Sequence, residues 1–460
     1  MSPRLELKSL HNNDLHNRRL GVCCRFWTAG DTFGDTRKKR HRNRRDRDWD
    51  EFPFKQYFTT IANNSSWPAK SVDRSQYRLK LKLSNWWFHQ CQLTLLDFPG
   101  ERFADAAMMH NDFYEWSHQQ LEWLASAAPM HNGQNGMGKL NKVQAYQRLL
   151  QADDVKMTTE GAIIDAYKLV LAELTNRWHI YASPSFFILD DRGKTAVELQ
   201  DELYKQVGPG NIRQDLIIEQ VAKGRCSGLR DNEFAPLEKR YWKDSPELVQ
   251  CFEKRYNEYR KQIVVPIFEQ LGRCDGIVML FDLADALMSG HEQMADLDTF
   301  VKQVIDAVRP GGNVFQAMFN CLGWSPRIRR IAVAASQCDR FHPEDREILS
   351  SLVEKLCGPH LTSIPGIQSQ YFACAAIRST TFFDGQLSGR ICRKGVPPGA
   401  AERYEIDRIP EDWADGEHWP QVWDPNQFQI DRVWPEMPKV FNASPSHIDL
   451  DAVFRFAAGW

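Results

Sequence analysis

The sequence predicts an α/β protein built on a doubly wound, mostly parallel sheet, with a large helical insertion and a loop-rich C-terminal extension. Two observations predict this class. Short apolar runs typical of buried strands recur along the chain and alternate with helical stretches. Residues 101–270 carry mostly helical spacing and stand between the early and the late runs, so we expect them to be an insertion between strands of one sheet.

Composition limits the possible classes of protein. The chain has 460 residues, 42% of them hydrophobic and 26% charged, which is typical of a folded protein with two or three domains' worth of core. A formal net charge of −2 argues against general attraction to nucleic acid. No apolar run approaches the roughly 20 residues that span a bilayer, although peripheral membrane association stays open. The eleven scattered cysteines and the absence of a signal-like start predict a cytoplasmic protein.

The first 50 residues form an atypical basic segment. Residues 20–27 have the apolar content of a strand. In residues 37–47, eight of eleven residues are Lys or Arg. Such a run is either a solvated arm or a nucleic-acid patch, and the lack of interleaved aromatic residues favours the arm. Nucleic-acid binding through residues 37–47 is therefore the weakest of the functional alternatives.

The sheet is predicted from its apolar runs. Residues 77–83 alternate apolar and polar side chains, and residues 91–96 form a short, mostly apolar run, so we expect two adjacent strands with the first nearer the edge. Three further buried strands are expected later in the chain, at residues 275–282, 331–335 and 371–377. The resulting division is 51–100 and 273–383 for the two parts of the sheet domain, 101–272 for the insertion, and 384–460 for the extension.

Helices are predicted in the insertion and at the C-terminal end. Residues 143–150 and 162–174 carry apolar side chains at three- and four-residue spacings. Ser245 and Pro246 are typical N-cap and N1 residues for a long helix that we expect to end near Gly272. In the extension, which is rich in Pro, Gly and Trp, we expect one amphipathic helix at residues 448–456.

Asp97-Phe-Pro-Gly100 follows a predicted buried strand directly. In a parallel sheet this places Asp97 and Gly100 at the carboxyl end of the strand, where such sheets bind ligands. The Asp97 carboxylate is a hard oxygen ligand suited to Mg²⁺, and Gly100 allows a backbone N–H to approach a terminal phosphate. The alternative is an ordinary turn after a strand, since Pro-Gly pairs are common there.

A second motif, Ser336-Gln337-Cys338-Asp339, ends another predicted strand. The Asp339 carboxylate can accept hydrogen bonds from N1 and N2 of guanine, and charged hydrogen bonds of about 1.5–3 kcal/mol each are enough to favour guanine over adenine. Gln337 stands two residues earlier, where its stem can lie beside the base. The alternative for Asp339 is the N-cap of a helix.

These motifs, together with Ala375 and Ala376, occur in the order of a Ras-type GTPase: a phosphate and Mg²⁺ strand, a base-reading strand, then a small-residue loop behind the base. From about Phe52 onward the chain resembles the YcjX-like family of bacterial GTPase-like P-loop proteins. The resemblance rests on Trp67-Pro68, on the Asp97 turn, on Asp282 to Gly290, on the Ser336–Asp339 strand end and on the terminal Leu450–Phe456.

The resemblance implies a Ras-like P-loop NTPase domain that binds GTP or GDP with Mg²⁺ and hydrolyses GTP, a role in stress response, and a protein partner that it does not identify. It implies that Asp97 holds Mg²⁺, that Gly100 senses the terminal phosphate, and that Asp339 reads guanine. The main-chain amides of Ala375 and Ala376 would back the base. Glu101 stands where such enzymes orient the attacking water, or else it simply begins a helix.

The chain departs from the family at two places. At residues 336–339 the family carries Thr-Lys-Ala-Asp, so Gln337 stands where the family has a lysine. The second departure is the phosphate loop. The family carries Gly-x-x-x-x-Gly-Lys-Thr, whereas here residues 29–36 have Ala29 for the first glycine and Asp35 for the lysine, and an aspartate repels phosphate. Either the protein is a degenerate, non-hydrolysing scaffold, or residues 22–50 reflect a misread gene start. A run with similar spacing at residues 133–139 is followed by Leu140 where the motif requires Ser or Thr, and it comes after a predicted helix, so we reject it.

Overall fold

The structure of this protein is a computed structural model, and the description below rests on the part of the chain placed well enough to describe. It comprises residues 17–26, 50–51, 59, 75–82, 90–98, 100–130, 141–151, 159–177, 183–185, 233–284, 287, 301–302, 328–362, 364–392, 399–406, 408–409, 430, 433–436 and 446–459. Side chains of residues 17–26 and a few others within these ranges are not described.

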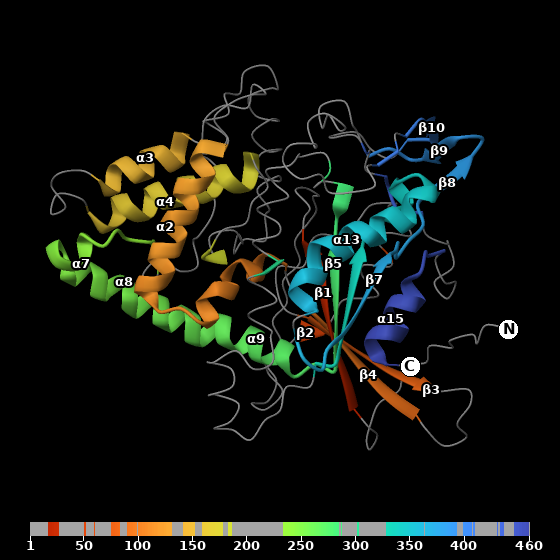
Figure 1. Cartoon of the computed structure of the whole chain (residues 1–460), viewed down its shortest axis with the longest axis horizontal. Helices are drawn as coiled ribbons and strands as arrows, with labels where there is room; N and C mark the ends of the chain where they lie inside the picture. Colours follow the sequence, from red (N-terminus) through yellow and green to blue (C-terminus); the bar gives the residue numbers. More distant parts are fainter. Residues whose placement is uncertain are drawn as a thin grey trace.

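A seven-stranded sheet of order β2-β3-β4-β1-β5-β6-β7 forms one half of the molecule (Figure 1). The strands are β1 (Asn17–Phe26), β2 (Asp50–Glu51), β3 (Ser75–Lys82), β4 (Gln90–Asp97), β5 (Gly276–Phe281), β6 (Arg330–Ala335) and β7 (Gln368–Ala373). Strands β4, β1, β5, β6 and β7 are mutually parallel, and β3 is antiparallel to β4. The prediction of a mixed α/β protein with a mostly parallel sheet is confirmed.

The predicted strands are present, with one difference in bounds. Strands β3 and β4 are neighbours with β3 nearer the edge, as the sequence predicts. Strand β7 covers residues 368–373, whereas the apolar run suggested 371–377. The chain leaves the ladder because Ala375 exchanges both backbone hydrogen bonds with Ile448, at 3.0 and 2.9 Å. The small apolar residues beyond Ala373 gave no sign of this exit.

Two helices cover opposite faces of the sheet. Alternate residues of β5 show the division, because Ile277 and Met279 pack in the main core while Val278 packs in a smaller one. Helix α13 (Arg346–Leu361) lies on the main-core face against β6 and β7. Helix α15 (Leu450–Ala458) covers the other face, against β5 and β6, and confirms the helix predicted near residues 448–456 (Figure 1).

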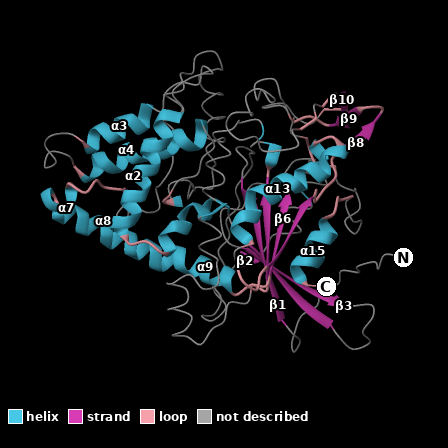
Figure 2. Cartoon of the chain, in the orientation of Figure 1, coloured by secondary structure: helices cyan, strands magenta, loops and turns pink. Residues whose placement is uncertain are grey.

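The helical region lies beside the sheet, on the left in Figure 2. Its elements are η1 (Gly100–Met109), α2 (Phe113–Met130), α3 (Asn141–Leu150), α4 (Glu160–Arg177), α7 (Tyr241–Asp244), α8 (Pro246–Tyr259), the π-helical turn η4 (Arg260–Val264) and α9 (Val265–Gly272). The predicted helices at 143–150 and 162–174 and the predicted start at Pro246 and end at Gly272 are confirmed. Trp116, Phe234 and Tyr256 are fully buried at its centre.

One buried carboxylate fastens η1 to the rest of this helical region. Asp105 is 1% exposed and accepts hydrogen bonds from Ser183 Oγ (3.0 Å), Ser185 N (2.8 Å), Ser185 Oγ (2.5 Å) and Tyr259 OH (2.6 Å). We call Asp105, Ser183, Ser185 and Tyr259 the Asp105 cluster. Arg102 Nη1 lies 3.3 Å from both Ser185 Oγ and Tyr259 OH. Burial raises the pKa of Asp105, and the hydrogen bonds from Ser185 and Tyr259 oppose that rise.

A second sheet begins just before the predicted boundary at residue 384 and continues into the C-terminal extension, which the sequence suggested to be rich in loops. This three-stranded antiparallel sheet is made of β8 (Thr380–Phe383), β9 (Gln386–Gly389) and β10 (Glu402–Tyr404). Asp384 and Gly385 both have positive φ in the β8–β9 turn, as a two-residue hairpin requires. Among the described helices, none combines the length and apolar character needed to cross a membrane.

Candidate functional site

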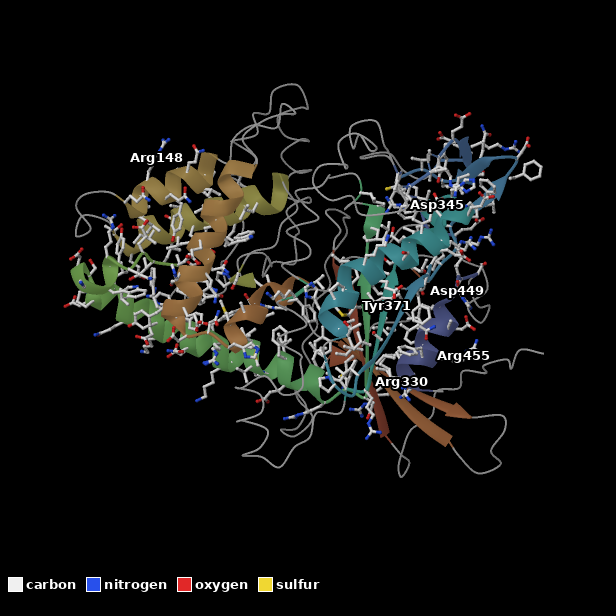
Figure 3. All side chains as sticks on the ribbon, viewed as in Figure 1. Arg148, Arg330, Asp345, Tyr371, Asp449 and Arg455 are labelled. Carbon is white, nitrogen blue, oxygen red and sulfur yellow. The ribbon has the colours of Figure 1, made fainter. Side chains whose placement is uncertain are left out.

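The candidate site lies along the carboxyl edge of the parallel strands. Asp97 is the last residue of β4, Asp282 follows β5, and Ser336 follows β6. Strand β1 lies between β4 and β5, so later strands were added on both of its sides. Open parallel sheets bind ligands outside the carboxyl ends of their strands at such a reversal of strand order. In Figure 3, Asp345 marks this end of β6 and Arg330 marks the opposite end.

The Asp97 turn connects β4 to η1. Asp97 pairs in register with Val22 of β1 on one side and with Ser75 of β3 on the other. Phe98 is fully buried and anchors the turn, and the buried Gly100 begins η1. The backbone of Glu101 lies in the first turn of η1, and its side chain is outside the described part of the structure. Asp97 and Gly100 therefore lie at the edge, next to the central strand.

Asp339 lies in a short 3₁₀ turn, η5 (Cys338–Arg340), just beyond β6. Its side chain is 5% exposed, and Oδ2 accepts a 2.7 Å hydrogen bond from the backbone N–H of Ser379. The hydroxyl of Thr380 donates to the Asp339 carbonyl. Burial raises the pKa of Asp339, while the Ser379 amide opposes the rise. The carboxylate thus joins the β6 turn to the loop after β7 and does not cap helix α13, which begins only at Arg346.

Ser336 and Gln337 have well-defined structural partners. Ser336 donates from its backbone N (2.7 Å) and its Oγ (3.0 Å) to the Phe281 carbonyl, which joins the ends of β6 and β5. Gln337 has the left-handed backbone conformation (φ 56°, ψ 35°). Its amide contacts Asp282 and Arg340, so its side chain points along the edge toward β5.

The loop predicted to back a base lies beside Asp339, and the amide that meets the carboxylate belongs to Ser379. Ala375 is buried, and its amide donates to the Ile448 carbonyl at 3.0 Å. Ala376 is exposed at the start of the loop. The structure thus brings Ser336, Gln337, Asp339 and this loop together, while Asp97 and Gly100 lie two strands away, across β1 and β5.

Sequence reasoning missed two residues here. Asp282 directly follows β5, and Asp97 is the last residue of β4, so the same signal, an acid at the end of an apolar run, was available for Asp282. Its side chain is fully buried and pairs with Arg340, whose side chain is 1% exposed, at 3.5 Å. Arg340 offered no signal, because a sequence does not reveal that an arginine is buried.

Several predictions concern residues outside the described part of the structure. They are the altered phosphate loop at 29–36, the basic run at 37–47 and the rejected run at 133–139. Among the described residues, no group of three or more His, Cys, Asp or Glu is placed to hold a metal. Mg²⁺ in nucleotide sites takes one or two carboxylates together with phosphate oxygens and water, so a single carboxylate at the strand edge, such as Asp97, would meet that requirement.

Comparison with known proteins gives one consistent result. The model of the YcjX-like family, DUF463, matches residues 15–200 and 224–459. A protein named "Ras-like GTPase YcjX" from Shewanella oneidensis is 23% identical over 333 residues, which are 69% of this chain and 61% of the relative. Its namesake from Escherichia coli K12 is 23% identical over 382 residues, 80% of this chain and 72% of the relative. The aligned part thus spans about three fifths of the Shewanella protein. Since the family model covers both the sheet strands and the helical region, this chain belongs to the YcjX-like family.

Proposed function

We propose that this protein binds GTP and GDP, with Mg²⁺, at the carboxyl edge of its sheet. The observation that carries the proposal is Asp339, a buried carboxylate held at this edge by the Ser379 amide. A carboxylate has about four lone-pair sites, so Asp339 can accept the Ser379 N–H and still accept N–H donors from a guanine. The relatives' name, Ras-like GTPase, agrees with this chemistry.

The strand order supports a Ras-like P-loop domain as the finer fold. The order β3-β4-β1-β5-β6-β7, with only β3 antiparallel, is the order of the six-stranded sheet in Ras-type domains. It puts Asp97 on one side of the central strand and Asp339 on the other. A nucleotide lying across the end of β1 would have its phosphates toward Asp97 and its base toward Asp339.

For the individual residues we propose the roles that the family resemblance implies. Asp97 would hold Mg²⁺, which neutralises phosphate charge when bound, and the Gly100 amide would face the terminal phosphate. Glu101 would orient the water for hydrolysis. Asp339 would accept from N1 and N2 of guanine beside the loop that contains Ala375 and Ala376.

A second candidate is a scaffold that keeps the fold without hydrolysing GTP. Asp35 favours it, because a carboxylate at the position of the phosphate-loop lysine adds negative charge where phosphates would bind. The two candidates differ in the phosphate half of the site only, and both keep Asp339.

Calorimetric titration of the full chain with GDP and GTP, with and without Mg²⁺, tests the proposal. We expect binding that Asp339→Asn weakens at least tenfold, about 1.4 kcal/mol or more. The same variant should gain affinity for xanthosine diphosphate, because the new amide donates to the C2 carbonyl that replaces the guanine amino group. No GDP binding at high micromolar concentration contradicts the proposal. Binding of GTP without phosphate release supports the scaffold.

A further inference from the structure

The turn that holds Asp339 contains a residue in a costly backbone conformation. Gln337 has φ 56° and ψ 35°, a region that side chains other than Gly, Asn and Asp rarely adopt. Such a conformation persists only where the surrounding structure holds it in place. The side-chain contacts of Gln337 are therefore expected to hold its backbone in this conformation.

Three side chains close a ring around this turn. Gln337 Nε2 donates to Asp282 Oδ2 at 3.0 Å, and Arg340 Nη1 donates to Gln337 Oε1 at 3.2 Å. Arg340 Nη1 also lies 3.5 Å from Asp282 Oδ1. We call Asp282, Gln337 and Arg340 the edge cluster. Arg340 Nη2 further donates to the Ile430 carbonyl at 2.9 Å, which extends the contacts to the C-terminal part of the chain.

The chemistry of this ring specifies glutamine at position 337. A carboxylate only accepts hydrogen bonds and a guanidinium only donates them, so the residue between them needs one donor and one acceptor. The glutamine amide supplies both. A lysine, which the family carries here, donates to Asp282 but cannot accept from Arg340, and it brings a second cation beside the guanidinium.

The ring holds both ends of the turn that presents Asp339. Gln337 precedes η5 and Arg340 ends it, so Asp339 lies between two residues fastened to the same buried Asp282. On its other side, Asp339 is fastened to Ser379 at 2.7 Å. The direction of the Asp339 carboxylate therefore depends on the edge cluster.

We propose that Asp282, Gln337 and Arg340 form a positioning cluster that sets the guanine specificity of Asp339 and that, in this chain, replaces the family's lysine. The inference rests on the proposed function, because it assigns a role to residues behind the same base site. In this arrangement, restoring the family residue by Gln337→Lys weakens guanine recognition.

The preference for GDP over inosine diphosphate tests the inference, because inosine lacks the 2-amino group that Asp339 would bind. The ratio of the two dissociation constants is measured by calorimetry on the full chain, and it does not depend on the fraction of protein that is folded. We expect a wild-type preference of about tenfold or more, from one charged hydrogen bond. It should fall at least fivefold in Gln337→Met and in Gln337→Lys.

Arg455→Met is the matched control, since it removes an exposed arginine paired with Asp451 on α15. We expect it to keep the wild-type preference. Should Gln337→Lys fail to fold, Gln337→Met, which keeps the side-chain length, decides the question alone. An unchanged preference in the Gln337 variants overturns the positioning role. If the wild-type protein binds no GDP, or binds GDP and inosine diphosphate equally well, the proposed function itself is contradicted.

Discussion

The edge cluster and the Asp105 cluster are both buried and polar, and they are built differently. In the edge cluster, an aspartate with a fully buried side chain is matched by an arginine that is 1% exposed, with a glutamine amide joining them. In the Asp105 cluster, the carboxylate is held by a backbone N–H and three hydroxyl groups, and Arg102 contacts two of these hydroxyl groups, those of Ser185 and Tyr259, at 3.3 Å.

This difference predicts how much stability each cluster loses when one of its side chains is replaced. A buried ion pair that loses one partner leaves an uncompensated charge in the interior, which costs several kcal/mol. A buried carboxylate that is held mostly by neutral donors is stabilised by several hydrogen bonds, so losing any one of them costs less free energy. Removing one partner should therefore lower the free energy of unfolding strongly in the edge cluster and less in the Asp105 cluster.

The largest expected effect compares the two clusters directly. Arg340→Met leaves Asp282 buried without its cation and should lower the free energy of unfolding by about 4 kcal/mol. Asp105→Asn keeps the side-chain volume but turns an NH₂ toward the donors of Ser185, and should cost about 2 kcal/mol. Urea unfolding measures both losses. The control Arg455→Met, at an exposed position, is expected to lower the free energy of unfolding by less than about 0.5 kcal/mol. A larger loss in Asp105→Asn than in Arg340→Met would reverse the comparison.

A smaller expected effect is the difference in stability between losing a hydrogen bond to a charged group and losing one to a neutral group on the same helix. Tyr259 OH donates to the Asp105 carboxylate at 2.6 Å, and Tyr256 OH donates to the Asn111 carbonyl at 2.8 Å. Both tyrosines are buried in α8. Because a hydrogen bond to a charged group is about twice as strong, Tyr259→Phe should cost about 2 kcal/mol and Tyr256→Phe about 1 kcal/mol. Equal losses in urea unfolding would show that Asp105 is not ionised.

The smallest expected effect at neutral pH is the contribution of Asp105 and Asp339 protonation to folding stability. Burial raises the pKa of both carboxyl groups, so this contribution grows in acid. Between the unfolded pKa of about 3.9 and each raised pKa, the folded protein binds more protons than the unfolded chain. Each group therefore adds stability as the pH falls through its raised pKa. GDP affinity should change in the opposite direction, by up to about tenfold per pH unit, because only ionised Asp339 accepts from guanine.

Urea unfolding and calorimetry between pH 7 and pH 4 measure these two trends. Asp105→Asn should remove its share of the acid stabilisation and leave the pH dependence of GDP binding intact. Asp339→Asn shows how much of that pH dependence comes from the phosphates of the nucleotide. A GDP affinity that does not decrease in acid beyond this control would contradict an ionised Asp339 in the site.

The sheet and the ends of its strands were predictable because their signals are local. An acid at the end of an apolar run located Asp97, and the strand end Ser336–Asp339 located Asp339; both residues lie at the carboxyl edge. The rule that located Asp97 would also have located Asp282. The exit of the chain after Ala373 was not predictable, because its cause is a backbone pairing between Ala375 and Ile448, 73 residues apart.

The partners of the site residues were less predictable than the residues themselves. Nothing local shows that Ser379 supplies the amide to Asp339, or that Gln337 lies between Asp282 and Arg340. These contacts depend on the packing of three strand ends. In the same way, Ser185 meets Asp105 only in the folded chain, 80 residues from it in sequence.

Helix α15 has a consequence for how the chain reaches its fold during synthesis. It covers the face of the sheet that includes Leu93, Val278 and Phe372, and Gly276 packs so closely against the Ala457 carbonyl that a Cβ there would collide with it. Residues 450–458 leave the ribosome after every strand of that sheet has been made. The part of this apolar face that α15 covers lacks that cover until then, and chaperones that bind exposed apolar surface have that interval in which to act.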